Sequence, residues 1–365
     1  MTDRSERHKL RQSAQHAVHR LDAGFSSIVS GWEESDGGSN YRDRMLKLDP
    51  VLVDSVTGGL LCGIDVDGGP TTEQLLVLKA IVSHLWERPD LDVGSVPHVG
   101  ARELANILTD ENTRTMFHEL HLALETCRHP QSLAQVAAVQ EYADALEVDG
   151  DDLEIFRDLI CSGVEAAAED YQRFLAIDMR DRSEPSLSET KVDALHPETQ
   201  LAEKLGAFSE YGPGTLGRAY LSFYERFGLS LPGIDLSLNN HFFVAHDMTH
   251  TIAGLSTTPA AEIALSAFQF AMNNNRINRA AFLASLVAHE AGFALPPHLS
   301  SGETGLLLDP PAAQLLGQEL RRGSQCRKDF SLVDHFALAP LLLSDVRSEF
   351  GVGAPVDPHD GHHWW

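Results

Sequence analysis

Residues 241–272 read HFFVAHDMTHTIAGLSTTPAAEIALSAFQFAM, and this stretch decides how we interpret the fold. Its apolar residues recur every three or four positions on both sides of a short break, which is the period of an α-helix. Gly254 ends the first segment, while Thr258 and Pro259 supply an N-cap and a first-turn proline for the second. The stretch therefore predicts two helices joined by a tight turn.

The same helical period extends over most of the chain in both directions. Upstream it runs from about residue 46 to 178, and downstream it covers about 196 to 353. Hairpin signals between alternating strands are absent. We therefore predict an all-α protein of two helical domains, 46–178 and 196–353, with a polar linker at 179–195, a mobile polar tail at 1–45 and a disordered tail at 354–365.

Local signals also set helix ends in the second domain. Thr215 is placed to cap a helix that Gly228 stops. Pro340 is expected to kink or split the last helix, because a proline inside a helix removes a backbone donor.

Composition excludes several classes of partner. The chain of 365 residues carries 28 lysines and arginines against 53 aspartates and glutamates, a net charge of -25, which argues against a nucleic-acid partner. The four cysteines form no CxxC pair, which is typical of reduced thiols. No apolar run is long enough to cross a bilayer, and the first residues do not resemble a secretory signal. We therefore expect a cytoplasmic protein.

The chemistry of the opening stretch lies in His246, Asp247 and His250, followed by Glu262. At about 100° per residue, the first three share one arc of a helix. The turn at Gly254 can fold the next helix back, so that Glu262 in its first turn faces them. Imidazole and carboxylate groups are donors for a borderline divalent metal. The pattern favours a metal site, with zinc as the expected ion, and the alternative is a hydrogen-bonded polar network in the core.

The spacing HDxxH, eleven residues, then Glu is similar to the signature of the Coq4 family of ubiquinone-biosynthesis proteins. The likeness extends to flanking segments and covers about residues 196–352. These segments read GPGTLGRAYLSFYERFGL, GLSTTPAAEIALSAFQFAM and LAPLLLSDVRSEFGV. The His, Asp, His and Glu spacing is the specific part of the resemblance.

The resemblance implies an all-helical domain that binds a divalent metal and holds a polyprenyl tail in an apolar cavity. It implies assistance in an oxidative decarboxylation and hydroxylation at ring carbon 1 of a coenzyme Q precursor. The implied partners are a prenylated aromatic or quinone-like lipid and a quinone-biosynthesis complex peripheral to the inner membrane face, and a homodimer is a further expectation. The implied ligands, and the catalytic candidates if the protein is an enzyme, are His246, Asp247, His250 and Glu262.

Further residues of the second domain have two interpretations each. The helices at 263–272 and 280–294 could line a lipid tunnel, or their apolar residues could be ordinary core. His289 and Glu290 could orient a metal ligand, or they could be a solvated or satisfied pair. Arg218 could meet an anionic head group, or it could form a structural ion pair.

Acidic residues gather in the first domain, where 141–170 contains eleven acids and a single base. Two Asp-Gly loops, IDVDGGPTTEQ and LEVDGDDLE, lack the spacing of an EF-hand. The segment HPQSLAQVAAVQEYADALEVDG is similar to the TerB (tellurite resistance) family, and the likeness covers about residues 50–178. It implies a cation-binding helical bundle of stress-response assemblies, and a solvated charged face is the alternative. The candidate residues are Asp65, Asp67, Glu73, Asp149, Asp151 and Asp152.

Three functions are open at this point. The first is a metal protein that acts on, or holds, a prenylated aromatic ring. The second is a non-enzymatic cation-binding stress-response protein with a lipid-binding scaffold. The third is a metal-dependent hydrolase, which ranks last because no separate general base stands out.

Overall fold

The computed structural model describes residues 46–130, 132–148, 178–193, 195–235, 237, 239–291 and 304–365. Within these ranges every regular element is a helix, so the all-α prediction is confirmed. In the same ranges, β-type pairing is limited to two isolated bridges, Thr215 with Leu342 and Leu255 with His363. None of the helices described is both long and apolar enough to span a membrane. The expected tail at 1–45 lies outside the described residues.

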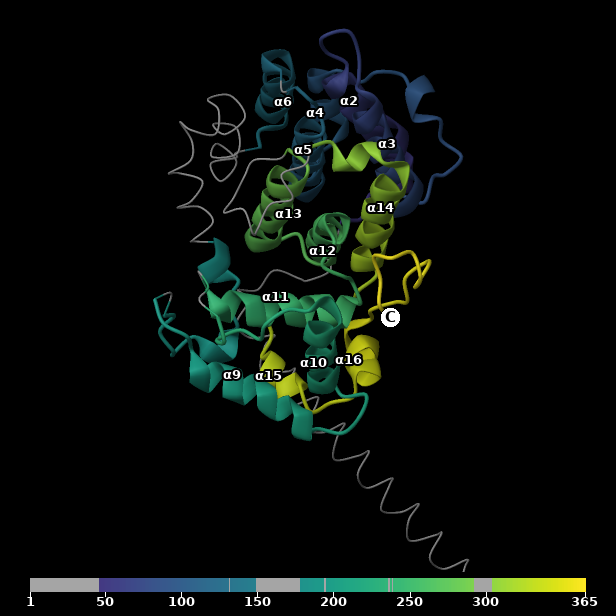
Figure 1. Cartoon of the computed structure of the whole chain (residues 1–365). Coiled ribbons are helices and arrows are strands. Elements are labelled where there is room, and N and C mark those ends of the chain that lie inside the picture. Colours follow the sequence, from purple (N-terminus) through teal and green to yellow (C-terminus); the bar gives the residue numbers. More distant parts are fainter. Residues whose placement is uncertain are drawn as a thin grey trace, which may run out of the picture. The chain divides into compact units, whose positions relative to one another are not determined.

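A first group of helices comes from the N-terminal half of the chain (Figure 1). Its members are α2 (Val53–Ile64), α3 (Thr72–Ala80), α4 (Ala101–Ile107), α5 (Glu111–Thr126) and α6 (Leu133–Leu146). A short π-helical segment at Ile81–Leu85 continues α3. Helix α2 packs against α4, α5 and α6, which buries its apolar face.

A second group surrounds the motif predicted from the opening stretch. Its members are α9 (Thr199–Gly206), α10 (Leu216–Phe227), α11 (Asn240–Ala253), α15 (His335–Leu338) and α16 (Leu343–Phe350). Thr215 caps α10 by accepting the Arg218 N–H, and Gly228 ends it in a left-handed conformation, as predicted. Pro340 lies between α15 and α16, so the predicted split is confirmed.

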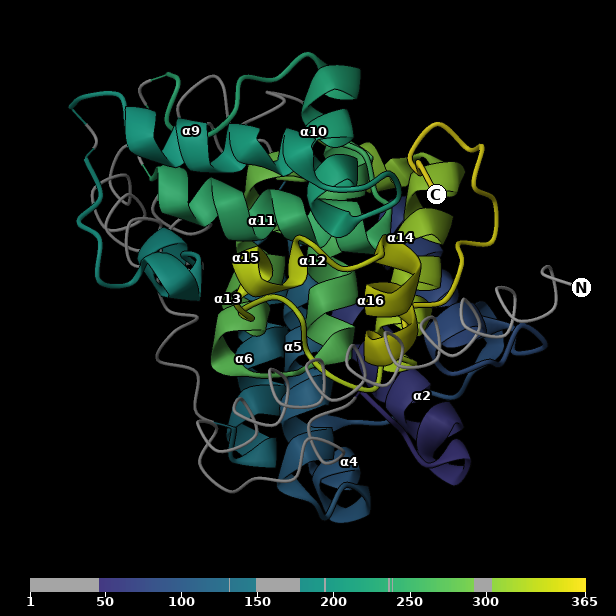
Figure 2. The ribbon, with the colours of Figure 1, turned by 90° about the horizontal axis from the view of Figure 1, so that it is seen from below.

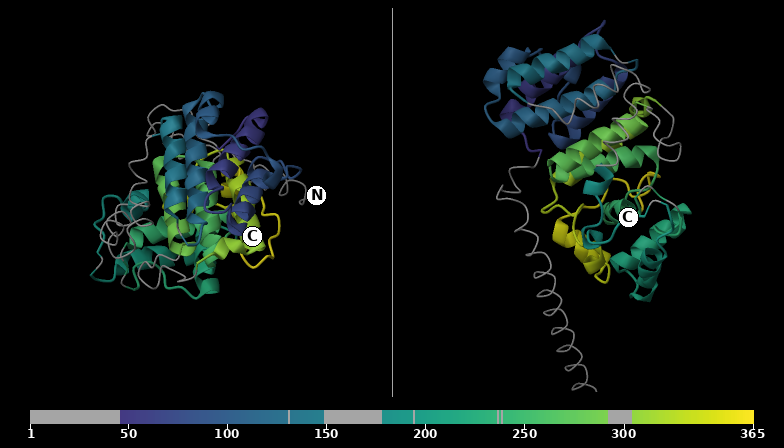
Figure 3. Two further views of the ribbon diagram at one scale, coloured as in Figure 1. Left: turned by 90° about the horizontal axis from the view of Figure 1, so that it is seen from above. Right: turned by 90° about the vertical axis from the view of Figure 1, so that its left-hand side faces the viewer.

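Three helices lie between the two groups: α12 (Pro259–Met272), α13 (Arg276–His289) and α14 (Pro310–Ser324) (Figures 1 and 3). Helix α14 packs along α12 and also against α3, while α13 packs against α12 and α5. Residues 44–365 belong to one compact unit. The expected division into two helical domains is therefore not confirmed.

The close packing of α12 and α14 depends on Gly323. A Cβ atom there would overlap the carbonyl oxygen of Phe268, a backbone atom that cannot rotate away. Gly323→Ala should lower the free energy of unfolding by about 3 kcal/mol, because overpacking forces a backbone shift. The matched control is Gly206→Ala at the end of α9, where a Cβ meets nothing within 4 Å and should be neutral or slightly stabilising. Chemical denaturation compares the variants, and equal stability would contradict the prediction.

The segment 179–195, which the sequence predicts to be a linker, packs into the fold. The Glu184 side chain is buried and lies 2.7 Å from Nδ1 of His335, while the amide of Asn239 donates to the Met179 carbonyl. These partners lie far away in the sequence, so the polar composition of the segment does not reveal them. The linker interpretation is therefore corrected.

The segment 354–365 is ordered, contrary to the predicted disordered tail. It lies beside α14 (Figure 2), where buried His363 contacts Glu319 at 3.2 Å. The indole of Trp364 donates to the Leu255 carbonyl, and the Arg347 guanidinium lies over the Trp365 ring. The two histidines and two tryptophans at its end supply the contacts that order it.

Candidate metal centre

Local sequence places the predicted ligands on two helices that meet at a tight turn. His246 and His250 lie one turn apart on α11, which begins at its N-cap Asn239 and ends at Gly254 in a left-handed conformation. Thr258 caps α12 by accepting the Ala261 N–H, which places Glu262 in the first turn. The end at Gly254 and the cap at Thr258 are the ones that the sequence predicts, whereas the Asn239 cap is not predicted.

Three donor atoms converge at this turn. Nε2 of His246 and Nε2 of His250 each lie 3.3 Å from Oε2 of Glu262, and 3.2 Å from one another. Two donors bound to one ion at about 2.0–2.1 Å lie about 3.3 Å apart when the angle at the ion is tetrahedral. The triangle therefore has the size of one face of a metal coordination shell, and the residues fit a divalent ion.

Burial and charge prepare these atoms as ligands. Burial lowers the pKa of His246 to about 4, so its imidazole is neutral at pH 7. Burial opposes the charge of Glu262, but the charge of His250 and hydrogen bonds from both imidazoles hold the pKa of Glu262 well below its usual range. Burial likewise disfavours a charged His250, but Glu262 outweighs it and raises the pKa of His250. A bound cation would replace the proton that this buried cluster otherwise holds.

Neighbouring groups orient the two imidazoles. Nδ1 of His250 lies 3.3 Å from the Leu255 carbonyl and can donate to it, which leaves Nε2 as the ring nitrogen that faces Glu262. The His246 ring stacks on Phe242 at 5.1 Å. Nδ1 of His246 is buried and has no hydrogen-bond partner among the described residues. The rings are thus held with Nε2 of each at the point of convergence.

Asp247 stands beside this triangle. It offers an oxygen within 4.8 Å of nitrogens of both His246 and His250. Its Oδ2 accepts a hydrogen bond from Tyr224, whose hydroxyl in turn receives one from Tyr220 at 3.2 Å. Burial raises the pKa of Asp247 to about 7. The tyrosines therefore hold the Asp247 carboxylate beside the two imidazoles.

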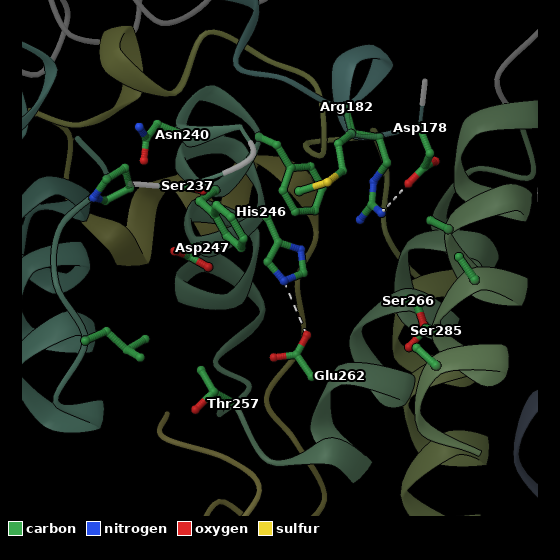
Figure 4. A pocket seen from close by; sticks show the side chains of 18 of the residues that line it. Asp178, Arg182, Ser237, Asn240, His246, Asp247, Thr257, Glu262, Ser266 and Ser285 are labelled. Carbon is green, nitrogen blue, oxygen red and sulfur yellow. Dashed lines mark hydrogen bonds and ion pairs between the residues drawn. The ribbon is translucent and has the colours of Figure 1, made fainter. Parts of the chain in front are cut away.

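A cavity of about 700 Å³ opens beside the centre (Figure 4). His246, Asp247 and Glu262 line it, whereas His250 is fully buried behind them. The wall from α13 presents small side chains at successive turns. The residues concerned are Ala281, Ala284, Ser285 and Ala288. Phe268 and Phe270 of α12 and Phe282 of α13 are fully buried, so for these large residues the interpretation as ordinary core is confirmed.

Charged residues of the cavity wall, among them Arg182 and Asp178, are missed by the sequence reasoning. Arg182 lines the cavity, lies 5.0 Å from the Phe242 ring centroid and donates to Asp178 at 3.2 Å (Figure 4). Both residues belong to the stretch at the end of the first predicted domain and the start of the linker. The contact of Arg182 with Phe242 of α11 joins residues distant in sequence, and no local pattern indicates it.

His289 and Glu290 separate to different places although they are adjacent. His289 lines the cavity, where burial lowers its pKa. Glu290 lies outside the cavity and accepts the Leu307 N–H at 2.8 Å. The guanidinium of Arg218 donates to the Ser209 carbonyl at 3.0 Å, and no carboxylate of the described residues forms an ion pair with it.

The acidic residues of the first half do not converge in the part of the chain that the structure describes. Asp65 lies 3.6 Å from His98, and Asp67 accepts from Ser132. The Glu73 side chain is buried and points elsewhere, toward His129. The remaining candidates, Asp149, Asp151 and Asp152, lie outside the described residues.

The chain was compared with protein-family models and with curated proteins. Neither comparison finds a match. The resemblances to the Coq4 and TerB families therefore rest on the motifs quoted above. The geometry of the centre and its cavity must support any functional conclusion.

Proposed function

We propose that this protein binds a divalent metal, zinc being the expected ion, and holds an aromatic ring of the quinone-precursor type beside it. The observation that supports the proposal is the convergence of two imidazole nitrogens and one carboxylate oxygen at a cavity wall. His250 is fully buried on the side of the site away from the cavity, while His246 and Glu262 face the cavity. A ligand in the cavity would therefore reach the metal from one side.

The cavity lining offers apolar surface and one guanidinium to an amphipathic acid. Phe242 and Phe243 of α11 and the small residues of α13 offer apolar surface for a ring and a prenyl tail. Arg182 offers a cation for a carboxylate or phenolate, because a guanidinium forms strong hydrogen bonds with such oxygens. We assign the acidic head group to the end near Arg182 and the metal centre.

A divalent ion held here would act as a Lewis acid on an oxygen of the ring. Replacement of an aromatic carboxyl group by hydroxyl, with loss of carbon dioxide, is a two-electron oxidation that needs an external oxidant such as dioxygen. The chain's own residues supply position: Arg182 orients the acid, and Phe242 packs beside His246. In this proposal the protein assists the oxidative decarboxylation and hydroxylation at carbon 1 by presenting the ring.

The test is the lipid content of the full-length protein. We expect an aromatic or quinone-like prenyl lipid to co-purify and to be released on denaturation, as detected by mass spectrometry. Arg182→Gln should lower the affinity for this ligand by about 10–100-fold, since a hydrogen bond to a charged group contributes about 1.5–3 kcal/mol. The matched control is Arg180→Gln, because Arg180 is exposed and lies outside the cavity lining.

The outcomes separate the candidate functions. A folded, metal-loaded protein without lipid, or equal ligand content in the Arg182 and Arg180 variants, would overturn the assignment of the cavity. A bound lipid that is never converted when an oxidant is supplied would favour the non-enzymatic lipid-binding scaffold.

A further inference from the structure

A second cluster of metal-binding groups lies outside the cavity, where three distant segments meet. Glu73 belongs to the first turn of α3, His129 follows α5, and Glu290 is the C-cap of α13. One ligand atom of each lies within 4.8 Å of the others. Nε2 of His129 is 2.9 Å from Oε1 of Glu290 and 3.8 Å from Oε2 of Glu73.

The carboxyl groups of Glu73 and Glu290 are buried, and no basic side chain of the described residues forms an ion pair with them apart from His129. Glu290 is fully buried and Glu73 is 5% exposed. Among the described residues no lysine or arginine pairs with either one, and the bonds of nearby Arg128 go to backbone carbonyls and Gln135. Burying such charges costs several kcal/mol unless a cation or hydrogen bonds compensate.

One carboxylate oxygen of the cluster is left without a partner. Oε2 of Glu290 accepts the Leu307 N–H at 2.8 Å, which fixes that carboxylate. Oε1 of Glu73 is buried and has no hydrogen-bond donor among the described residues. Burial, together with the neighbouring Glu290, raises the pKa of Glu73 to about 9, so without a metal ion this carboxyl group binds a proton. A buried carboxylate oxygen without a donor, beside a histidine and a second carboxylate, is the arrangement that a bound cation would neutralise in place of that proton.

We propose that Glu73, His129 and Glu290 form a second divalent-metal site, separate from the centre at His246. One imidazole and two carboxylates form a mixed nitrogen and oxygen set that suits Zn²⁺. The side chain of His129 is 24% exposed, which gives an ion access from solvent. The ion would connect α3 and the residue after α5 to the end of α13. Its role would be to stabilise the packing of helices from the two halves of the chain.

The test counts zinc bound to the full-length protein after removal of metal, reloading and dialysis. We expect about two ions per chain in the wild type, one for each His and carboxylate set. Glu73→Gln should bind one ion fewer than the wild type. Zinc should also raise the melting temperature of this variant by less than it raises that of the wild type. The control Glu103→Gln removes an exposed carboxylate from α4 and should leave the count unchanged.

The variants also distinguish this site from the first. The double variant His246→Ala and His250→Ala should keep the ion that Glu73→Gln removes, whether or not the proposed function is correct. Glu73→Gln preserves the shape of the side chain, and His129→Gln at the rim is the second variant if Glu73→Gln does not fold. If the two carboxyl groups only share a proton, zinc content will be the same in wild type, Glu73→Gln and His129→Gln, and the proposal fails.

Discussion

Replacing both His246 and His250 with alanine is expected to abolish the metal binding that we propose for the α11–α12 turn. The double variant loses two of the three donor atoms that lie within 3.3 Å of one another, and the carboxylates of Glu262 and Asp247 that remain should bind the ion much more weakly. Elemental analysis of the purified full-length protein measures the loss, which should equal one ion per chain. The matched control replaces the exposed His98 and His196, and should keep the full metal content.

Glu262→Gln is the sharper companion variant, because the alanine pair leaves a buried carboxylate without its partners and can destabilise the fold. Glutamine keeps the shape of Glu262 and removes its charge. Its metal affinity should fall by more than about 100-fold, since losing a ligand costs more than losing a group that merely orients one. If the double variant and Glu262→Gln both retain the metal, the ligands lie elsewhere.

The centre could be predicted from sequence because its geometry is local. His246 and His250 share a helix face, and the N-cap Thr258 fixes where α12 begins and hence where Glu262 lies. Helical period and capping preferences depend on residues that are close together in the sequence. The turn between the helices is short enough that these rules determine which side chains meet.

The cavity and the second cluster could not be predicted in this way. Arg182 and Glu184 read as linker residues, yet contacts with α11 and with His335 bury them in the fold. Glu73 reads as one more residue of an acidic loop, and it pairs instead with groups 56 and 217 residues further along the chain, at positions 129 and 290. A polar residue is expected to be exposed unless a residue distant in sequence pairs with it. The local sequence pattern does not show such a partner.

The C-terminal residues His362–Trp365 contact the turn that carries the proposed metal ligands. The Leu255 carbonyl accepts from the Trp364 indole at 3.0 Å and is also the group that faces Nδ1 of His250. The Ser256 N–H donates to the His362 carbonyl at 2.8 Å, and the Trp364 N–H donates to the Gly254 carbonyl at 2.9 Å. The turn that sets Glu262 opposite the histidines is thus held by the end of the chain.

Truncation after Gly361 is therefore expected to weaken metal binding by about 10–100-fold, the usual cost of losing groups that orient ligands. The truncation removes the hydrogen bonds on both sides of Leu255 and also the contact between His362 and the α12 N-cap Thr258. Competition with a chelator of known affinity measures the change. Val356→Ala, an exposed position in the same segment, is the control and should leave the affinity unchanged.

Trp364→Phe tests whether the C-terminal segment orients His250 through a hydrogen bond or only shields the candidate metal centre from water. The Trp364 ring packs 5.8 Å from Phe223, which lies 5.6 Å from the His250 ring, and phenylalanine preserves much of this packing. Only the N–H to the Leu255 carbonyl is lost, so a roughly tenfold weaker affinity is expected if that carbonyl orients His250. Wild-type affinity in Trp364→Phe with a loss on truncation would mean that the segment acts by excluding water. Wild-type affinity in both would show that the turn holds the ligands without the C-terminal residues.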